Sequence, residues 1–233
     1  MKLLAVDSSS LAASAALWQE DKLLGEFFIN AGLTHSQTLM PMVQQLLHTT
    51  GTALGDIDCF AVSVGPGSFT GLRIGIAAVK GMAFGLDKPC VPVSTLEGLA
   101  YNLQGFEGVV CPVMDARCQQ AYTALFEAGP QGIRRLTGDS ALPLEQLAAL
   151  LQEQKKPLRL VGDGALMCYN SLDKNEGIAT APAALLHQRA ASVGAAALRL
   201  ARQGAFCPAE ALEPAYLRLP QAQRELLARQ AQS

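Results

Sequence analysis

A strand, a glycine-rich loop and a helix follow one another between residues 59 and 86, and this unit constrains the fold more than any other part of the sequence. Cys59–Val64 is an apolar run with Ser63 as its one polar residue, Gly65–Gly71 has the sequence G-P-G-S-F-T-G, and a helical pattern then extends to about Leu86. Fully apolar strands joined to helices are typical of sheets that are covered on both faces. The unit therefore predicts a layered α/β fold.

Further apolar runs lie on both sides of this unit. Three runs near the N-terminus, separated by polar turns, predict an antiparallel meander. Strands and helices then alternate, and no uncharged apolar run reaches the 18 residues of a membrane span. The expected strands cover residues 3–6, 13–18, 23–29, 90–93, 109–114, 121–126, 133–137 and 158–161, and the other expected helices cover 34–50, 94–103, 144–154, 182–203 and 221–232.

Three local signals refine the expected helix ends. Thr34 with Gln37, and Ser94 with Glu97, have the spacing of a capping box. Pro41 should bend its helix or end the first segment of it.

The glycine-rich loop has the position of a phosphate-binding loop but not the spacing of one. A P-loop ends in G-K-[ST], where this chain has Thr70-Gly71-Leu72, and the dinucleotide-binding motif needs its third glycine at Thr70. A hydrolase elbow needs glycines where Pro66 and Thr70 stand. The spacing disfavours all three, and a tight turn whose glycines serve only geometry stays an open alternative.

The helix after the loop is apolar on nearly all sides. One apolar face comprises Leu72, Ile76, Val79, Ala83 and Leu86. A second face of small residues comprises Gly71, Gly75, Ala78, Gly81 or Met82, and Gly85. Each glycine inside a helix costs about 1 kcal/mol relative to alanine, so a close backbone approach is expected at this second face. It packs either on the helix from Thr34 within the chain or, as we favour, on another protein, with Arg73 and Lys80 at the rim.

Charge and residue spacing argue against several functions. Lys and Arg number 18 against 20 Asp and Glu, so the chain lacks the basic surface of a stand-alone nucleic-acid binder. The three histidines and six cysteines have no metal-ligand spacing. Asp7, at a strand end, is a candidate base or magnesium contact, and Asp115 with Arg117 a candidate ion pair at a domain cleft. The simpler alternative for Asp7 is that its carboxylate caps the turn that follows it. The simpler alternative for Asp115 and Arg117 is that both are solvated on the surface.

Several motifs are similar to those of the TsaB (YeaZ) family. They are Leu4–Ser9, His35–Pro41, Gly65–Gly75, Val93–Glu97, Asp115–Arg117 and Pro214–Arg218. The resemblance extends from residue 1 to about 218 and is most specific in the first hundred residues. It implies an actin-like, sugar-kinase-like (ASKHA) α/β fold of two similar subdomains. We expect residues 1–104 and 105–212 to form them, and 213–233 to return to the first.

The resemblance implies a role in placing a threonylcarbamoyl group on N6 of the tRNA adenosine beside the anticodon. Family members are non-catalytic partners of the related subunit TsaD, which transfers the group from threonylcarbamoyl-adenylate. The ATPase TsaE joins the assembly, and members without TsaD are often homodimers. We therefore expect a cytoplasmic protein with no cofactor, no metal, no membrane contact and only an indirect contact with tRNA.

Two departures from catalytic relatives support this expectation. TsaD has the sequence H-H-M-E-G-H after the strand that corresponds to Cys90–Val93, and its histidines bind the metal, whereas Ser94–Leu99 here is S-T-L-E-G-L. Hydroxyl groups and a leucine cannot replace imidazole ligands. Ser8–Ser10 also stands where ATP-binding relatives have a glycine in their first phosphate hairpin.

The family pairs through helices of its first subdomain, which match the helices at 34–50 and 71–86. The expected partner interface comprises Leu39, Met42, Val43, Leu46, Arg73, Ile74, Gly75, Ala78, Lys80, Gly81, Met82 and Gly85. The motif residues whose role stays open are Asp7, Ser8, Gly65, Pro66, Gly67, Ser68, Thr70, Asp115 and Arg117. Gly75→Leu or Ala78→Glu should abolish the complex and leave the isolated fold largely intact.

Two other functions remain as alternatives. The first is an actin-fold kinase or a glycoprotease-like hydrolase in which Asp7 positions magnesium or water. The second is direct tRNA binding through the terminal helix with Arg224 and Arg229, which the sequence pI of about 5.9 disfavours.

Overall fold

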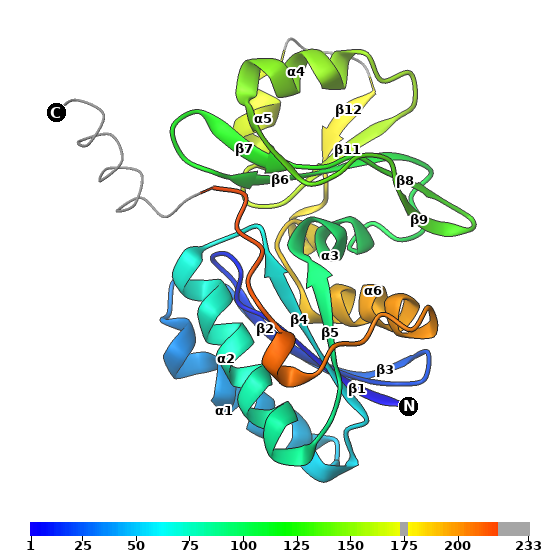
Figure 1. Cartoon of the computed structure of the whole chain (residues 1–233). Coiled ribbons are helices and arrows are strands. Elements are labelled where there is room, and N and C mark those ends of the chain that lie inside the picture. Colours follow the sequence, from blue (N-terminus) through cyan, green and yellow to red (C-terminus); the bar gives the residue numbers. More distant parts are fainter. Residues whose placement is uncertain (173–176, 219–233) are drawn as a thin grey trace, which may run out of the picture.

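The computed structural model describes residues 1–172 and 177–218, which form two α/β subdomains, one above the other in Figure 1. The helix expected at residues 221–232, with Arg224 and Arg229, lies outside the described residues.

The N-terminal subdomain is built on a five-stranded sheet with the order β3-β2-β1-β4-β5. Its strands are β1 (Lys2–Asp7), β2 (Ala13–Gln19), β3 (Lys22–Ile29), β4 (Cys59–Gly65) and β5 (Cys90–Ser94). The first three strands pair antiparallel, which confirms the expected meander, while β4 and β5 run parallel to β1.

The C-terminal subdomain repeats this order. Its strands are β6 (Gly108–Asp115), β7 (Gln120–Thr123), β8 (Phe126–Gly129), β9 (Gly132–Arg135), β10 (Ser140–Pro143), β11 (Leu158–Val161) and β12 (Ile178–Thr180). The strand order of the sheet is β10-β7-β6-β11-β12, and the hairpin of β8 and β9 pairs with β6 through β8. The pairing is again antiparallel on one side of the first strand and parallel on the other. The expected pair of similar subdomains is confirmed.

Helices cover both sheets, and two of them are exchanged between the subdomains. The helices are α1 (His35–Thr49), α2 (Phe69–Leu86), α3 (Thr95–Tyr101), α4 (Leu144–Gln152), α5 (Ala165–Ser171) and α6 (Ala190–Arg202). In the N-terminal subdomain α1 and α2 lie side by side over one sheet face, and α6 packs on the other face (Figure 1). In the C-terminal subdomain α4 and α5 cover one face and α3 the other. Because α6 follows β12 in the chain, its packing on the first sheet ties the halves together. The boundaries at residues 104 and 212 stay a prediction.

Three local expectations are wrong. Thr34 is the N-cap of α1, but its side chain does not cap the helix, because its hydroxyl makes no bond to the first-turn N–H groups. The alternative in which Pro41 ends the first segment of its helix is wrong, since α1 is unbroken from His35 to Thr49. The helix expected at 182–203 is a 3₁₀ turn at Ala183–Leu185 followed by α6. Ser94 does accept a bond from Glu97 N, as expected.

Among the described residues, α2 alone is long and apolar enough to cross a membrane by length and composition. Seven of its residues, including Leu72, Ile76 and Val79, are buried in the chain. Packing on the sheet therefore explains the apolar character of this buried side of the helix.

Candidate functional site

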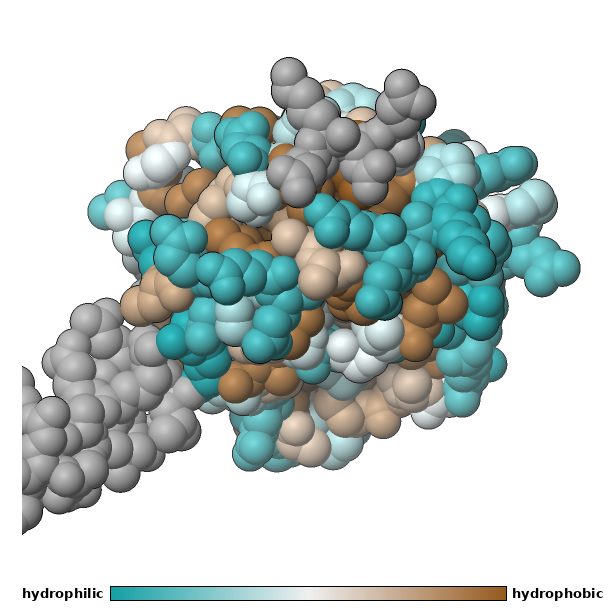
Figure 2. All heavy atoms as spheres, turned by 90° about the horizontal axis from the view of Figure 1, so that it is seen from above, coloured by the Kyte–Doolittle hydropathy of each residue, from teal (hydrophilic) through white to brown (hydrophobic). Residues whose placement is uncertain are grey.

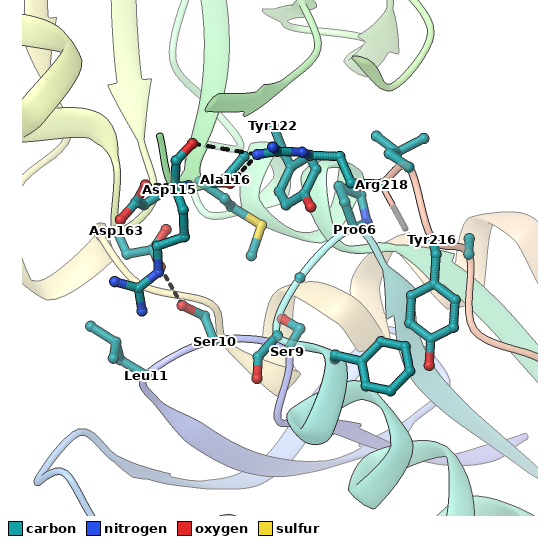
Figure 3. A pocket seen from close by; sticks show the side chains of 17 residues that line it. Ser9, Ser10, Leu11, Pro66, Asp115, Ala116, Tyr122, Asp163, Tyr216 and Arg218 are labelled. Atoms are coloured by element: carbon teal, nitrogen blue, oxygen red, sulfur yellow. Dashed lines mark hydrogen bonds between the residues drawn. The ribbon is translucent and has the colours of Figure 1, made fainter. Parts of the chain in front are cut away.

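A cleft with a volume of about 560 Å³ lies between the subdomains (Figure 3). The turn after β1 and the loop before α2 form one wall, and the turn after β6 and the loop after β11 form the other. A chain segment near the C-terminus crosses its mouth. In sequence order the lining side chains labelled in Figure 3 are Ser9, Ser10, Leu11, Pro66, Asp115, Ala116, Tyr122, Asp163, Tyr216 and Arg218.

Asp7 ends β1 beneath this cleft and is almost fully buried. Its carboxylate accepts hydrogen bonds from Ser9 N at 2.9 Å, from Ser9 Oγ at 2.8 Å, and from Ser63 Oγ. Burial raises the pKa of Asp7, and the three donors oppose that rise only in part. All these partners belong to the turn after β1 and to β4. The geometry therefore supports the simpler alternative, in which Asp7 fixes this turn.

The glycine-rich loop is packed against the turn after β1. Ser68 N donates to Ser9 O at 2.7 Å, so the two loops touch directly. A Cβ atom on Gly67 would lie 2.4 Å from Ser9 O, and one on Gly71 would lie 2.1 Å from Ser8 O. These distances are far below van der Waals contact, so both positions require glycine. Carbonyl oxygens of the chain's own backbone thus occupy the space in which a phosphate-binding loop would receive its anion.

The remaining loop residues serve the helix. Ser68 is the N-cap of α2 and accepts a bond from Gly71 N at 3.2 Å. Thr70 is exposed on the first turn of α2. The turn and the loop leave no gap for a phosphate between them, although both line the cleft.

The opposite wall of the cleft carries charged side chains. Asp115 ends β6 at the position that Asp7 has in β1, but it is exposed, and it accepts a bond from Arg117 N at 2.7 Å. Asp163 accepts a hydrogen bond from Ser10 Oγ across the cleft, and burial raises the pKa of Asp163. Arg117, Cys118 and Gln119 all have positive φ angles between 53° and 63°. Residues other than glycine adopt this backbone conformation at a cost in free energy, so the turn after β6 is strained.

The run Ser94–Leu99 forms the start of α3 and lies in the core. Glu97 makes an ion pair with Arg199 and another with Arg135, the latter at 3.3 Å. Among the described residues there is no group of three or more His, Cys, Asp or Glu side chains that could hold a metal ion. The run is therefore a packing element that joins α3 to α6 and to β9.

The structure divides the expected partner-interface residues into two groups. The buried group comprises Leu39, Met42, Val43, Leu46, Gly75 and Met82. These residues pack in the chain's own core, which corrects their assignment, because a buried side chain offers no area to a partner. The exposed or half-buried group comprises Arg73, Ile74, Ala78, Lys80, Gly81 and Gly85.

Gly75 has an internal reason to be glycine. A Cβ atom there would lie 2.6 Å from Ser8 Oγ and 3.4 Å from Val62. The expectation that Gly75→Leu leaves the isolated fold intact is therefore wrong. A Cβ atom on Gly81 or on Gly85 would instead have no neighbour within 4 Å, so these two glycines lie open on the surface of α2.

The exposed side of α2 also carries residues that the sequence analysis did not single out. Phe84 is 69% exposed, and Ala77 is exposed between Arg73 and Gly81. On the adjacent helix, Met40 is 37% exposed and Pro41 is exposed. We call these five residues, Met40, Pro41, Ala77, Gly81 and Phe84, the α1–α2 surface. Helical spacing alone could have located Ala77 and Phe84, which share a side of the helix with Gly81.

Comparison with known proteins shows what this chain resembles. The family model described as "TsaD: tRNA N6-adenosine threonylcarbamoyltransferase" matches residues 30–226. The tRNA threonylcarbamoyladenosine biosynthesis protein TsaB of Escherichia coli is 33% identical over 94% of this chain and 95% of its own length.

Two solved structures extend the comparison to the fold. YeaZ from Pseudomonas aeruginosa superposes with a TM-score of 0.82 at 30% identity, covering 93% of this chain and 99% of that one. The activator of 2-hydroxyisocaproyl-CoA dehydratase from Clostridium difficile, with bound ADPNP, gives a TM-score of 0.52 at 12% identity, covering 88% and 97%. The second likeness concerns the fold alone, which is the actin-like, sugar-kinase-like α/β fold. The chain belongs to the TsaB family, whose members are related to the transferase TsaD.

Proposed function

We propose that this member of the TsaB family acts in tRNA threonylcarbamoyladenosine biosynthesis as a non-catalytic partner subunit of TsaD. In this role it supports the transfer of threonylcarbamoyl from threonylcarbamoyl-adenylate to N6 of the tRNA adenosine beside the anticodon. TsaE joins the pair, the chain forms a homodimer when TsaD is absent, and tRNA is contacted only through the complex. In this proposal the chain is a cytoplasmic protein.

The observation that carries the docking role is the α1–α2 surface. All five of its residues are uncharged, and two of them, Met40 and Phe84, are large exposed apolar side chains. Exposed aromatic and methionine side chains beside small residues are typical of the centre of a protein interface. Arg73 and Lys80 flank this surface, but each already contacts the chain's own C-terminal segment, Tyr216 Oη and Glu210 O respectively, at 3.0 Å.

Three further observations support a non-catalytic role. The turn after β1 packs directly on the glycine-rich loop, Asp7 is engaged by three internal donors, and Glu97 is engaged by two arginines. The carboxylate that the kinase and hydrolase alternative assigns to magnesium or water, that of Asp7, is thus engaged by the chain's own residues.

The test compares two substitutions that place glutamate on different helices. Gly81→Glu adds a charged side chain to open space on α2 and replaces a glycine that weakens the helix, so the isolated fold should be retained. We expect affinity for TsaD to fall about 100-fold or more, because the carboxylate would lose its water in the contact. The matched control is Leu166→Glu on α5, where the side chain is 58% exposed and far from the proposed contact.

Analytical ultracentrifugation of each variant with TsaD measures the affinity, and a threonylcarbamoylation assay with and without this chain measures the supporting role. Equal affinity of Gly81→Glu and wild type would overturn the docking surface. Full activity of TsaD without this chain would overturn the supporting role. Micromolar binding of Mg-ATP to the isolated chain, measured by calorimetry, would favour the kinase alternative.

A further inference from the structure

Residues 213–218 cross the mouth of the cleft, and we call this segment the strap. In Figure 1 it is the red-orange trace that runs from beside β5 towards β6 and β7. Its first half is attached to the N-terminal subdomain. Ala215 N donates to Val64 O at 2.7 Å, and the ring of Tyr216 stacks on that of Phe69 with centroids 4.6 Å apart. The guanidinium of Arg73 lies 3.9 Å from the centre of the Phe69 ring, and its Nε donates to Tyr216 Oη.

The second half of the strap is attached to the C-terminal subdomain. Arg218 Nη1 donates to Ala116 O and, at 3.4 Å, to Arg117 O. Figure 3 shows the Arg218 side chain reaching across the cleft to this turn. Because the turn after β6 has three consecutive positive φ angles, its conformation needs support from outside, and Arg218 binds two of its carbonyl groups.

The rest of the fold makes room for the strap. A Cβ atom on Gly65, which has a φ of +137°, would lie 2.2 Å from Ala215 O. The first glycine of the glycine-rich loop thus permits the strap to pass, just as Gly67 and Gly71 permit the turn after β1. Deeper in the cleft, the hydrogen bond from Ser10 to Asp163 makes a second connection between the walls.

We propose that the strap fixes the opening between the two subdomains, with Tyr216 as the positioning residue on one wall and Arg218 on the other. In proteins of two lobes, opening and closing needs a hinge whose walls separate freely. Here the walls cannot separate without breaking the Tyr216 stack or the Arg218 hydrogen bonds. The cleft is therefore held at one width, and the N-terminal end of α2 is held with it. This inference goes beyond the docking role and does not depend on it.

The experiment is hydrogen–deuterium exchange, followed by mass spectrometry, on the isolated full chain. The readout is the turn after β6, whose amides at Ala116 and Gln120 bond within the turn. If the strap couples the walls, Tyr216→Ala should accelerate exchange at residues 115–120 about tenfold, although Tyr216 touches only the opposite wall. Arg218→Ala should do the same, and Gly65→Ala should do so by displacing Ala215.

Two variants serve as controls. Tyr216→Phe keeps the ring stack and loses only the bond from Arg73, so exchange at residues 115–120 should change less than in Tyr216→Ala. Glu213→Ala alters an exposed residue of the same strap and should leave the exchange of this turn at the wild-type rate. If Tyr216→Ala accelerates exchange only around Phe69 and leaves residues 115–120 unchanged, the strap consists of two unconnected local contacts, and the proposal is overturned. Unchanged exchange of this turn in Arg218→Ala overturns it as well.

Discussion

The two subdomains share one strand order but differ in the helices that cover it. In the N-terminal subdomain the helix between β3 and β4, α1, has 15 residues, and the helix between β4 and β5, α2, has 18. Their counterparts α4 and α5 have 9 and 7 residues. The short pair covers its sheet face with few exposed turns, whereas the long pair carries the α1–α2 surface. The proposed docking surface thus lies on the half with the longer helices, although both halves have the same topology.

The helices of both halves carry large exposed apolar side chains, Met40 and Phe84 on α1 and α2 and a second pair on α5. Figure 2 views the molecule from above Figure 1, over the C-terminal subdomain, where hydrophilic side chains are interspersed with smaller hydrophobic areas. On the C-terminal helices the large exposed apolar side chains are Leu166 and Tyr169, both on the short helix α5. Exposed apolar side chains alone do not distinguish the two surfaces, so the proposal that docking depends on α2 and not on α5 is tested by the pair Gly81→Glu and Leu166→Glu.

The largest expected effect concerns the exchange of α6 between the halves. A Cβ atom on Gly194 would lie 2.3 Å from Trp18 Nε1, so Gly194→Val forces α6 away from the N-terminal sheet. We expect the free energy of unfolding to fall by about 3 kcal/mol. Trp18 is the single tryptophan, and its indole donates to Ala191 O, so its fluorescence reports on this contact.

Denaturant unfolding followed by fluorescence and by far-UV circular dichroism measures this effect. Both probes should shift together, because α3 and α6 join the halves into one cooperative unit. Ser192→Val, a half-buried position of the same helix, is the control and should change the midpoint little. A second transition at an unchanged midpoint would show instead that the halves unfold independently.

An intermediate effect distinguishes the two sides of α2. Gly71→Ala brings a methyl group against Ser8 O and should lower the free energy of unfolding by about 2 kcal/mol. Gly81→Ala adds a methyl group in open space and should raise it by up to about 1 kcal/mol, because alanine has the higher helix propensity. Urea unfolding of both variants beside wild type measures the two signs. If the free energy of unfolding changed in the same direction in both variants, the assignment of one buried and one open side of α2 would be contradicted.

The smallest effect compares the aspartates that end the first strand of each half. Burial raises the folded-state pKa of Asp7, so the native state binds more protons than the unfolded state above about pH 4, where a free aspartate ionises. The free energy of unfolding should therefore fall as the pH rises from there through the raised pKa. Asp7→Asn should reduce this dependence, because asparagine has no proton to lose.

Asp115→Asn is the matched control for Asp7→Asn, because Asp115 has the same strand position but is exposed. Thermal melts of wild type and both variants between pH 4 and 8 give the comparison. An identical pH dependence in wild type and Asp7→Asn would show that Asp7 keeps an ordinary pKa.

Local patterns predicted much of the fold. The apolar run at Cys59–Val64, the loop and the helix to Leu86 are where the sequence placed them, and the order of the first three strands follows from their short polar turns. The strand β12 and the helix α5 were not expected, because their segments are short and have no clear periodicity. The long helix at 182–203 was expected from an alanine-rich composition, but only α6 within it packs on a sheet.

The candidate site was harder to predict than the fold. The sequence analysis placed Gly75 and Gly81 on the same small-residue face of the helix and expected a close contact there. Only the structure shows Gly75 against Ser8 and Gly81 facing open space. Leu39 and Leu46 were assigned to an interface because the TsaB family pairs through helices of its first subdomain. The structure shows that they instead belong to the apolar stripe with which α1 covers its own sheet.

The sequence by itself determined the meander and the strand–loop–helix unit of the first half, because hydrophobic period, turn residues and glycine positions act over a few residues. It also carried the motifs of the TsaB family. The tertiary structure alone decided which side of α2 meets its own chain, which loops fill the phosphate position, and that α3 and α6 change places between the halves. These features depend on contacts between residues far apart in the chain. The presence of a glycine in the sequence therefore does not show which atom lies close to it in the fold.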